Sequence, residues 1–189
     1  SGGGVSIFQN SPFVKYNTSS GLNGNYIFNA VNTRRNDLWV GTEGTGIVRI
    51  NDTSSVTFDE EYGFWSEKVE ALIEDRNGDI WIGTEGSGLG IFSQYDGKDT
   101  IYTYSQSMGH RSMTSNWISC FAEDPNTGTM YMGTFGGGVM SLRRTFEFPL
   151  NQTFRKIRPE NGSFPERINS LDFIDGQMWF TSSDGSYGY

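Results

Sequence analysis

Apolar and polar residues alternate along four segments of the chain, which is typical of half-buried β-strands. A short polar turn follows each segment, and a second apolar segment carrying an aromatic residue follows each turn. The alternating segments are 27–31, 69–73, 118–122 and 168–173. The pattern therefore predicts β-hairpins that recur along the chain.

The turns between the paired segments contain residues that tolerate positive φ, as two-residue hairpin turns require. Asn77-Gly78 and Asp175-Gly176 are the clearest cases. Asp75 and Asp124 stand just before two of the turns, where a carboxylate can accept hydrogen bonds from turn amides. We expect these two aspartates to have structural roles.

The second segment of each hairpin belongs to an internal repeat. The run from Leu38 to Ile47 returns from Ile80 to Leu89 and again from Met130 to Val139, each time with Gly-Thr after the aromatic strand. A degraded fourth copy, 178–185, has Thr181-Ser182 in place of Gly-Thr. The aromatic anchors at positions 39, 81, 131 and 179 lie 42, 50 and 48 residues apart. This period predicts an all-β fold, a β-propeller built of four-stranded blades.

Composition and charge narrow the function further. The 189 residues include 25 glycines and carry a formal net charge of -8, so a nucleic-acid surface, which needs clustered Lys and Arg, is not expected. Cys120 is the only cysteine, which excludes an intrachain disulfide and a thiolate zinc site. No apolar run is long enough to span a bilayer, and we expect no membrane contact by this segment. The glycine-rich segments are followed by strand patterns, whereas a phosphate loop needs a helix N-terminus.

The blade boundaries follow from the repeat. Residues 2–8 match 136–142, so the chain begins within the outer strands of a blade, and it is expected to end after a second strand near 184–185. We predict one propeller region of about four blade equivalents, in the order outer strands 1–21, blades 22–64, 65–112 and 113–163, and inner strands 164–189. The two partial blades could complete one blade in a closed ring. Alternatively, exposed strand edges could pair with a second copy or with further blades.

Candidate ligand contacts lie on the loops that precede the innermost strands and on those that join the second and third strands, because both sets emerge at one end of a propeller channel. Aromatic rings there can stack on a pyranose, while carboxylates and a guanidinium can bind its hydroxyls. We therefore expect an oligosaccharide or another small-molecule ligand. The candidate residues are Tyr26, Glu43, Trp65, Glu85, Trp117, Phe135, Phe164 and Arg167.

No set of residues predicts catalysis. Glu43 and Glu85 could form a pair of the glycosidase type, but their equivalent repeat positions favour a shared structural role, since catalytic pairs sit in dissimilar environments. His110 is the only histidine and has no triad partners, and Cys120 is interpreted as a small buried residue. We expect no catalytic residue, no metal and no cofactor.

The segment from Asp75 to Leu89 resembles the two-component regulator propeller repeat, and three of the four copies are close to it. The resemblance implies a seven-bladed ring, of which this chain would be a part, in the periplasmic sensor region of a Bacteroides-type hybrid two-component system. It also implies a non-catalytic, ligand-sensing segment whose histidine kinase lies elsewhere in the parent protein. The alternative is a fragment of a polysaccharide-acting propeller enzyme, a glycoside hydrolase or a lyase.

Overall fold

The computed structural model describes most of the chain as strands in five antiparallel sheets. The described residues are 5–7, 14–22, 24, 26–44, 46–64, 66, 68–94, 97–109, 112–143, 154–159, 162–183 and 185–188. The structure includes two single 3₁₀ turns, η1 (Thr18–Ser20) and η2 (Glu60–Tyr62). The predicted all-β class is confirmed.

The strands follow the repeat. Sheet I contains β1 (Val5–Ile7) and β2 (Val14–Tyr16). Sheet II contains β3 (Ile27–Asn32), β4 (Leu38–Thr42), β5 (Ile47–Ile50) and β6 (Ser55–Phe58). Sheet III contains β7 (Val69–Glu74), β8 (Ile80–Thr84), β9 (Leu89–Ser93) and β10 (Thr100–Tyr104). Sheet IV contains β11 (Ile118–Glu123), β12 (Thr129–Thr134), β13 (Val139–Arg143) and β14 (Arg155–Lys156), and sheet V contains β15 (Ile168–Ile174), β16 (Gln177–Ser182) and β17 (Gly185–Gly188).

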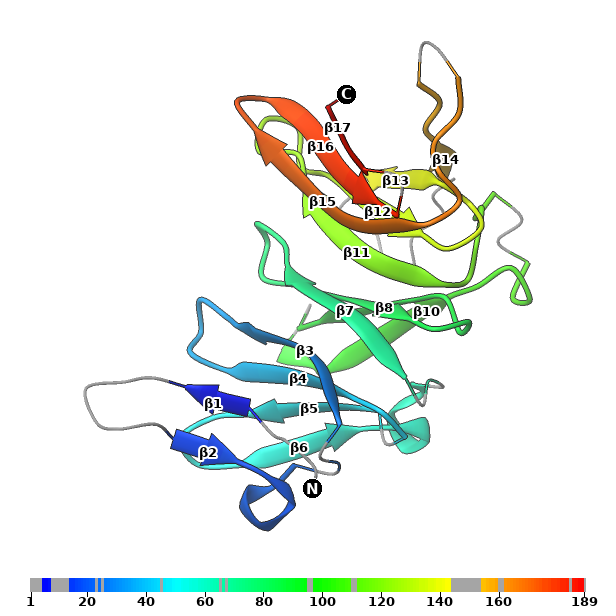
Figure 1. Cartoon of the computed structure of the whole chain (residues 1–189). Coiled ribbons are helices and arrows are strands. Elements are labelled where there is room, and N and C mark those ends of the chain that lie inside the picture. The colour runs from blue at the N-terminus through cyan, green and yellow to red at the C-terminus, as the bar shows by residue number, and fades with distance from the viewer. Residues whose placement is uncertain are drawn as a thin grey trace.

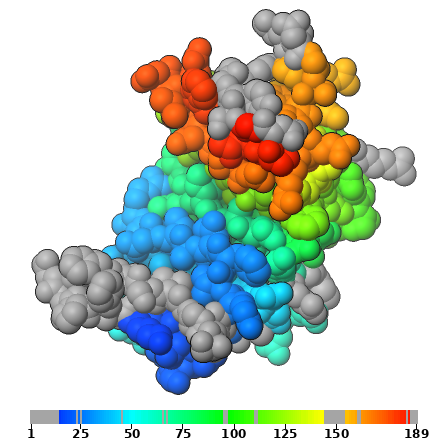
Figure 2. All heavy atoms as spheres, viewed as in Figure 1, coloured from blue at the N-terminus to red at the C-terminus, as the bar shows by residue number. Residues whose placement is uncertain are grey.

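Each sheet is an antiparallel meander in chain order, and the sheets stack on one another in the same order (Figure 1). Sheet I lies at one end of the stack and sheet V at the other, so the two partial sheets do not meet (Figure 1). The space-filling view shows the same progression from the blue N-terminal end to the red C-terminal end (Figure 2). The arrangement is that of successive propeller blades, as the repeat predicts.

Sheet V differs from the sequence-based expectation, because the chain does not end after a second strand. Residues Gly185–Gly188 form a third strand, β17, which pairs antiparallel with β16 in the register Ser182 with Gly185 and Trp179 with Gly188. Gly185 adopts a φ of 134°, which allows the chain to reverse without the Gly-Thr motif of the earlier repeats. The missing motif therefore does not prevent the second hairpin.

A buried aspartate organises the hairpin turn of sheet III, as predicted. Asp75 Oδ1 accepts from the amides of Asn77 at 2.8 Å and Asp79 at 3.0 Å, while Oδ2 accepts from Trp81 Nε1 at 3.1 Å. Asp124 does the same in sheet IV, with the Asn126 amide at 2.8 Å. The carboxylates thus satisfy turn amides that would otherwise lack partners.

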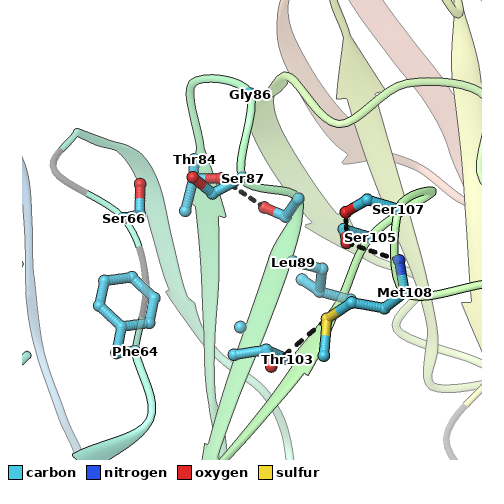
Figure 3. A pocket seen from close by; sticks show the side chains of 12 residues that line it. Phe64, Ser66, Thr84, Gly86, Ser87, Leu89, Thr103, Ser105, Ser107 and Met108 are labelled. Carbon is cyan, nitrogen blue, oxygen red and sulfur yellow. Dashed lines mark hydrogen bonds between the residues drawn. The ribbon is translucent and has the colours of Figure 1, made fainter. Parts of the chain in front are cut away.

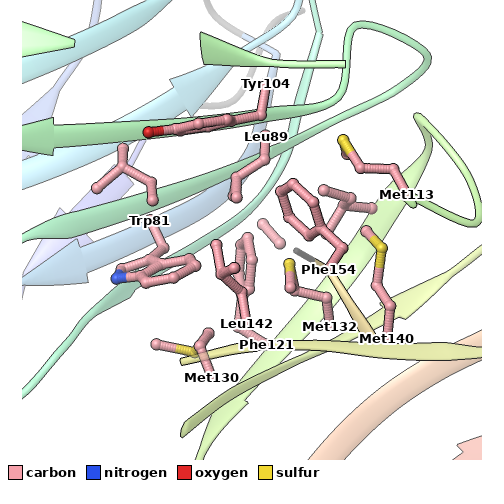
Figure 4. Close-up of a cluster of buried hydrophobic side chains, with 13 residues drawn as sticks. Trp81, Leu89, Tyr104, Met113, Phe121, Met130, Met132, Met140, Leu142 and Phe154 are labelled. Atoms are coloured by element: carbon pink, nitrogen blue, oxygen red, sulfur yellow. The ribbon is translucent and has the colours of Figure 1, made fainter. Parts of the chain in front are cut away.

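Hydrophobic clusters fill the four spaces between neighbouring sheets. Trp39 lies between sheets II and III, where its ring centroid is 4.5 Å from that of Phe92. Trp81 lies between sheets III and IV, facing Met130 and other side chains of sheet IV (Figure 4). These two tryptophans, which are 1% exposed, thus fill the space between neighbouring sheets.

The glycine after each aromatic strand lets the next sheet approach closely. A Cβ on Gly41, Gly83 or Gly133 would lie 2.6, 2.8 or 2.6 Å, respectively, from an atom of the next sheet. Those atoms belong to the first residues of the next innermost strands, Val69 and Ile118 for the first two glycines and Ile168 for Gly133, although Cys120 of its own sheet is closer still to Gly133. The Gly-Thr motif is therefore a spacing device between blades.

Two arginines in hairpin turns join neighbouring sheets at the opposite end from the Gly-Thr motif. The Arg34 amide donates to Glu74 Oε2 at 2.9 Å, and Arg34 Nε lies 3.3 Å from Glu74 Oε1. One repeat later, the Arg76 amide donates to Glu123 Oε2 at 2.9 Å, and Arg76 Nε lies 2.5 Å from Glu123 Oε1. We call each pair an inter-sheet clasp. In the next repeat the arginine position is Pro125, and the corresponding position of sheet V is Phe173 rather than a glutamate.

Candidate functional site

The loops at the Gly-Thr end of the stack bring together the residue before each innermost strand and the residue after each second strand. The Glu43 amide donates to the Tyr26 carbonyl at 3.0 Å, and the Glu85 amide donates to the Lys68 carbonyl at 3.1 Å. The Phe135 amide likewise donates to the Trp117 carbonyl at 3.0 Å. Sheets II, III and IV thus each present a pair of side chains at this end.

Neighbouring pairs are also joined across the sheet boundaries. Single β-bridges link Glu43 to Lys68 and Phe135 to Arg167. The pairs therefore form a row that crosses sheets II to V. We call this the rim row, and it comprises Tyr26, Glu43, Lys68, Glu85, Trp117, Phe135 and Arg167.

A β-bulge at the start of each innermost strand adds a second layer of side chains beside the rim row. The register shifts between Ile27 and Asn29 in β3, and at the equivalent place in β7, β11 and β15. A bulge changes the direction of the side chain at the extra residue. The extra residues are Phe28, Glu70, Ser119 and Asn169.

Lys68 is the centre of the charged part of the rim row. Its ammonium forms ion pairs with Glu85 and with Glu70 Oε1, the latter at 3.2 Å, and lies 4.8 Å from the ring centroid of Phe28. The hydrogen bond to Glu85 raises the pKa of Lys68 above its usual value. This part of the rim contains three glutamates, Glu43, Glu70 and Glu85, but one lysine, so it carries an excess of negative charge.

The other half of the rim row is aromatic. The Trp117 and Phe135 rings lie 4.5 Å apart between centroids and are tilted by 58°, and the guanidinium of Arg167 sits 4.2 Å from the Phe135 ring centroid. Ser115 positions this group, because its Oγ donates to the Phe135 carbonyl at 2.6 Å and accepts from the Trp117 amide at 3.0 Å. Trp117 Nε1 is buried without a hydrogen-bond partner among the described residues.

Six of the eight candidates from the sequence lie in the rim row. Tyr26 is the most open, with 68% of its surface exposed. Phe164 lies elsewhere, because its ring packs edge-on against Phe180, 5.0 Å away, in the cluster between sheets IV and V. Trp65 lies outside the described residues.

The sequence candidates did not include Phe28, Lys68 or Glu70 as contact residues. Phe28 is 44% exposed although it lies in a strand. The apolar pair Ile27-Phe28 interrupts the alternation of β3 and was the available signal for a bulge.

The surroundings of Glu85 and Cys120 do not favour a catalytic role for either residue. Glu85 is held in an ion pair by Lys68, which suits an anchored carboxylate better than a proton donor. Burial raises the pKa of the Cys120 thiol to about 11, so this cysteine is protonated near neutral pH and is a poor nucleophile. Among the described residues, no group of His, Cys, Asp and Glu could hold a metal ion, and no helix is long and apolar enough to cross a membrane.

Comparison with family models identifies the repeat. Residues 21–44 and 63–86 match the two-component regulator propeller. In these two segments the chain is similar to the two-component regulator propeller repeat. The matched residues include Tyr26, Glu43, Lys68 and Glu85, so four of the seven residues of the rim row lie within the matched segments. The resemblance stated from the sequence is confirmed.

Solved structures show the same fold. The extracellular domain of BT3049 from B. thetaiotaomicron, described as a hybrid two-component system, is 26% identical with a TM-score of 0.74, over 99% of this chain and 24% of that chain. The extracellular domain of BT4673 from the same organism is 21% identical with a TM-score of 0.73, over 97% of this chain and 24% of that chain. The chain thus spans about a quarter of the length of these structures.

Propeller enzymes share the fold at lower similarity. Virginiamycin B lyase from Staphylococcus aureus is 13% identical with a TM-score of 0.62, over 97% of this chain and 61% of that chain. At this identity the likeness concerns the fold alone. A comparison with curated protein sequences found no match.

Proposed function

We propose that this chain is a non-catalytic, ligand-sensing propeller segment of a bacterial two-component sensor and that its rim row recognises a carbohydrate. The observation that carries the proposal is the rim row together with the bulge residues beside it, where exposed aromatic rings adjoin anchored charges. Tyr26 and Phe28 are exposed beside Lys68, whose ammonium is fixed by Glu70 and Glu85.

This arrangement suits a sugar for two reasons. An exposed aromatic face can cover the C–H face of a pyranose, while fixed carboxylates and an ammonium can bind its hydroxyl groups through charge-assisted hydrogen bonds. The anchoring of the charges also lowers the entropy lost when the ligand binds. Because glutamates outnumber the lysine here, the site favours a neutral sugar over a uronate.

The similarity to extracellular sensor domains supports a periplasmic or extracellular location for this segment. In that setting the ligand would bind outside the cell, and the signal would pass to output domains of the parent protein. We expect neither nucleic acid nor a cofactor as a partner.

We also propose that further propeller blades of the parent protein cover the outer face of sheet V. Trp179 is 40% exposed there, whereas Trp39 and Trp81 at the equivalent positions are buried by the following sheet. Thr181 replaces the close-approach glycine, so the next blade would sit farther away than in the earlier interfaces.

The experiment that tests the function separates a sensor from an enzyme. The chain is incubated with a panel of polysaccharides and their oligosaccharide fragments, new reducing ends and unsaturated products are measured, and binding is followed by calorimetry. We expect binding of at least one fragment without turnover. Turnover that disappears in Glu43→Gln or Glu85→Gln would establish the polysaccharide-acting enzyme instead.

A further inference from the structure

Sheet III contains a pocket of about 500 Å³ that is separate from the rim row. It lies over β8, β9 and β10, with Phe64 on one side and Met108 on the other (Figure 3). The volume is within the range of small-molecule sites, about 300–1,000 Å³.

The floor of the pocket differs from the other repeats. It includes Gly90, which pairs with Ile82 in the same register in which Val48 pairs with Val40 and Met140 pairs with Met132. Val48 and Met140 are fully buried in sheets II and IV. In sheet III no side chain projects from this position, and the Phe64 ring lies close against the glycine, since a Cβ there would be 3.1 Å from Phe64 Cε2. The floor of the pocket is therefore backbone, with Phe64 packed beside it.

The walls combine apolar and hydroxyl groups without any charge. Phe64, Leu89 and Met108 supply the apolar part. None of the described lining residues is charged. Six side-chain hydroxyls surround the pocket, those of Ser66, Thr84, Ser87, Thr103, Ser105 and Ser107.

Several of these hydroxyls can exchange or add a hydrogen bond. Thr103 Oγ1 faces Met108 Sδ at 3.8 Å, and a thioether is a weak acceptor. Thr84 Oγ1 donates to the Gly88 carbonyl at 2.7 Å and is fully buried, so it shapes the wall rather than contacting a ligand. Ser105 and Ser107 share one hydrogen bond of 2.8 Å between their Oγ atoms, which leaves further capacity on both.

From this lining we propose that the Gly90 pocket is a second binding site, which takes an uncharged, hydroxylated ring of monosaccharide size. A charged ligand would lose hydration without finding a counter-charge, and a purely apolar ligand would cover the wall hydroxyls without offering them a further hydrogen bond. A ring with one apolar face and several hydroxyls satisfies both kinds of wall. The pocket does not depend on the rim row, although the Ser66 hydroxyl that lines it accepts from the Lys68 amide at 3.3 Å.

Backbone amide NMR of the whole chain tests the proposal with methyl glycosides of glucose, galactose, mannose and xylose at millimolar concentration. We expect at least one glycoside to shift the amides of Gly86–Gly90 and Thr103–Met108 in a saturable way, and glucuronate to leave them unchanged. Gly90→Val, whose side chain would enter the space beside Phe64, should abolish the shifts.

Two further variants each change a single threonine to valine, so they test the pocket with little risk to folding. Thr103→Val removes one wall hydroxyl and should weaken binding roughly three- to ten-fold, as for the loss of one hydrogen bond. Thr57→Val is the matched control, because Thr57 pairs with Val48 as Thr103 pairs with Gly90, and it should leave the affinity unchanged.

Three outcomes would overturn the proposal. The first is that no glycoside shifts the pocket amides in a saturable way. The second is that the parent and Gly90→Val bind a glycoside with equal affinity. The third is that the pocket binds cyclohexane-like probes more tightly than the glycosides. Shifts confined to the amides around Tyr26 and Lys68 would reject the pocket while supporting the rim row, so the two proposals fail separately.

Discussion

At the scale of single residues, Gly83 allows sheet IV to approach sheet III closely, and this is its role rather than backbone flexibility. A Cβ at this position would lie 2.8 Å from the Ile118 carbonyl oxygen, which belongs to the backbone of the next sheet and cannot move aside alone. Gly83→Ala should therefore lower the free energy of unfolding by roughly 1–3 kcal/mol, as for other overpacked interiors. Urea denaturation measures this. Thr181→Ala is the control at the equivalent position of sheet V, and an equal loss there would contradict the spacing role.

Cys120 gives a prediction about pH at the same scale. Its pKa is raised by burial from 9.0 to about 11 in the folded chain, so the unfolded chain ionises first as the pH rises. The stabilisation is complete below the unfolded pKa and is lost progressively between about pH 9 and 11, by at most about 2–3 kcal/mol. Cys120→Ser should flatten this part of the stability profile measured by urea denaturation. A parent and variant with parallel profiles would show that Cys120 is not responsible.

At the scale of elements, the inter-sheet clasps should couple neighbouring sheets. Arg76→Ala and Glu123→Ala each break the clasp between sheets III and IV. The double variant should lower the free energy of unfolding by less than the sum of the two single changes, because the interaction between the two side chains is lost only once. We expect a coupling energy of roughly 0.5–1 kcal/mol from a double-mutant cycle, since the pair is partly exposed. Additive effects would mean that the two side chains act separately.

The positions of most strands could be predicted from the sequence. The repeat located the innermost strands to within one residue of β3, β7, β11 and β15, because alternation and turn residues are local signals. The third strand of sheet V was missed, because Gly185 performs the reversal without the Gly-Thr motif on which the expectation relied. The contact between Lys68 and Phe28 could not be predicted either, because it joins a bulge in one sheet to the loop before the next.

At the scale of the whole molecule, the order of the sheets follows from the repeat, but the sites do not. The rim row was largely predictable, because equivalent positions of a repeat meet at one end of the stack. The Gly90 pocket was not, because it lies in a repeat whose third strand has a glycine at this register, and its lining depends on how Phe64 and Met108 pack there. Repeats thus predict what their copies share, and a ligand site can arise where one copy differs.

The central claim is that two exposed aromatics, Tyr26 of the rim row and Phe28 of the bulge beside it, bind a carbohydrate, and calorimetry tests it most directly. The chain is titrated with its cognate oligosaccharide fragment and compared with Tyr26→Ala and Phe28→Ala. Tyr62→Ala serves as the control, since Tyr62 is 49% exposed but lies in η2, away from both positions in the chain. We predict that each of the first two variants weakens binding by roughly 1–3 kcal/mol, the range of aromatic anchors, while the control binds as the parent does. Equal affinities for the parent, Tyr26→Ala and Phe28→Ala would contradict the claim.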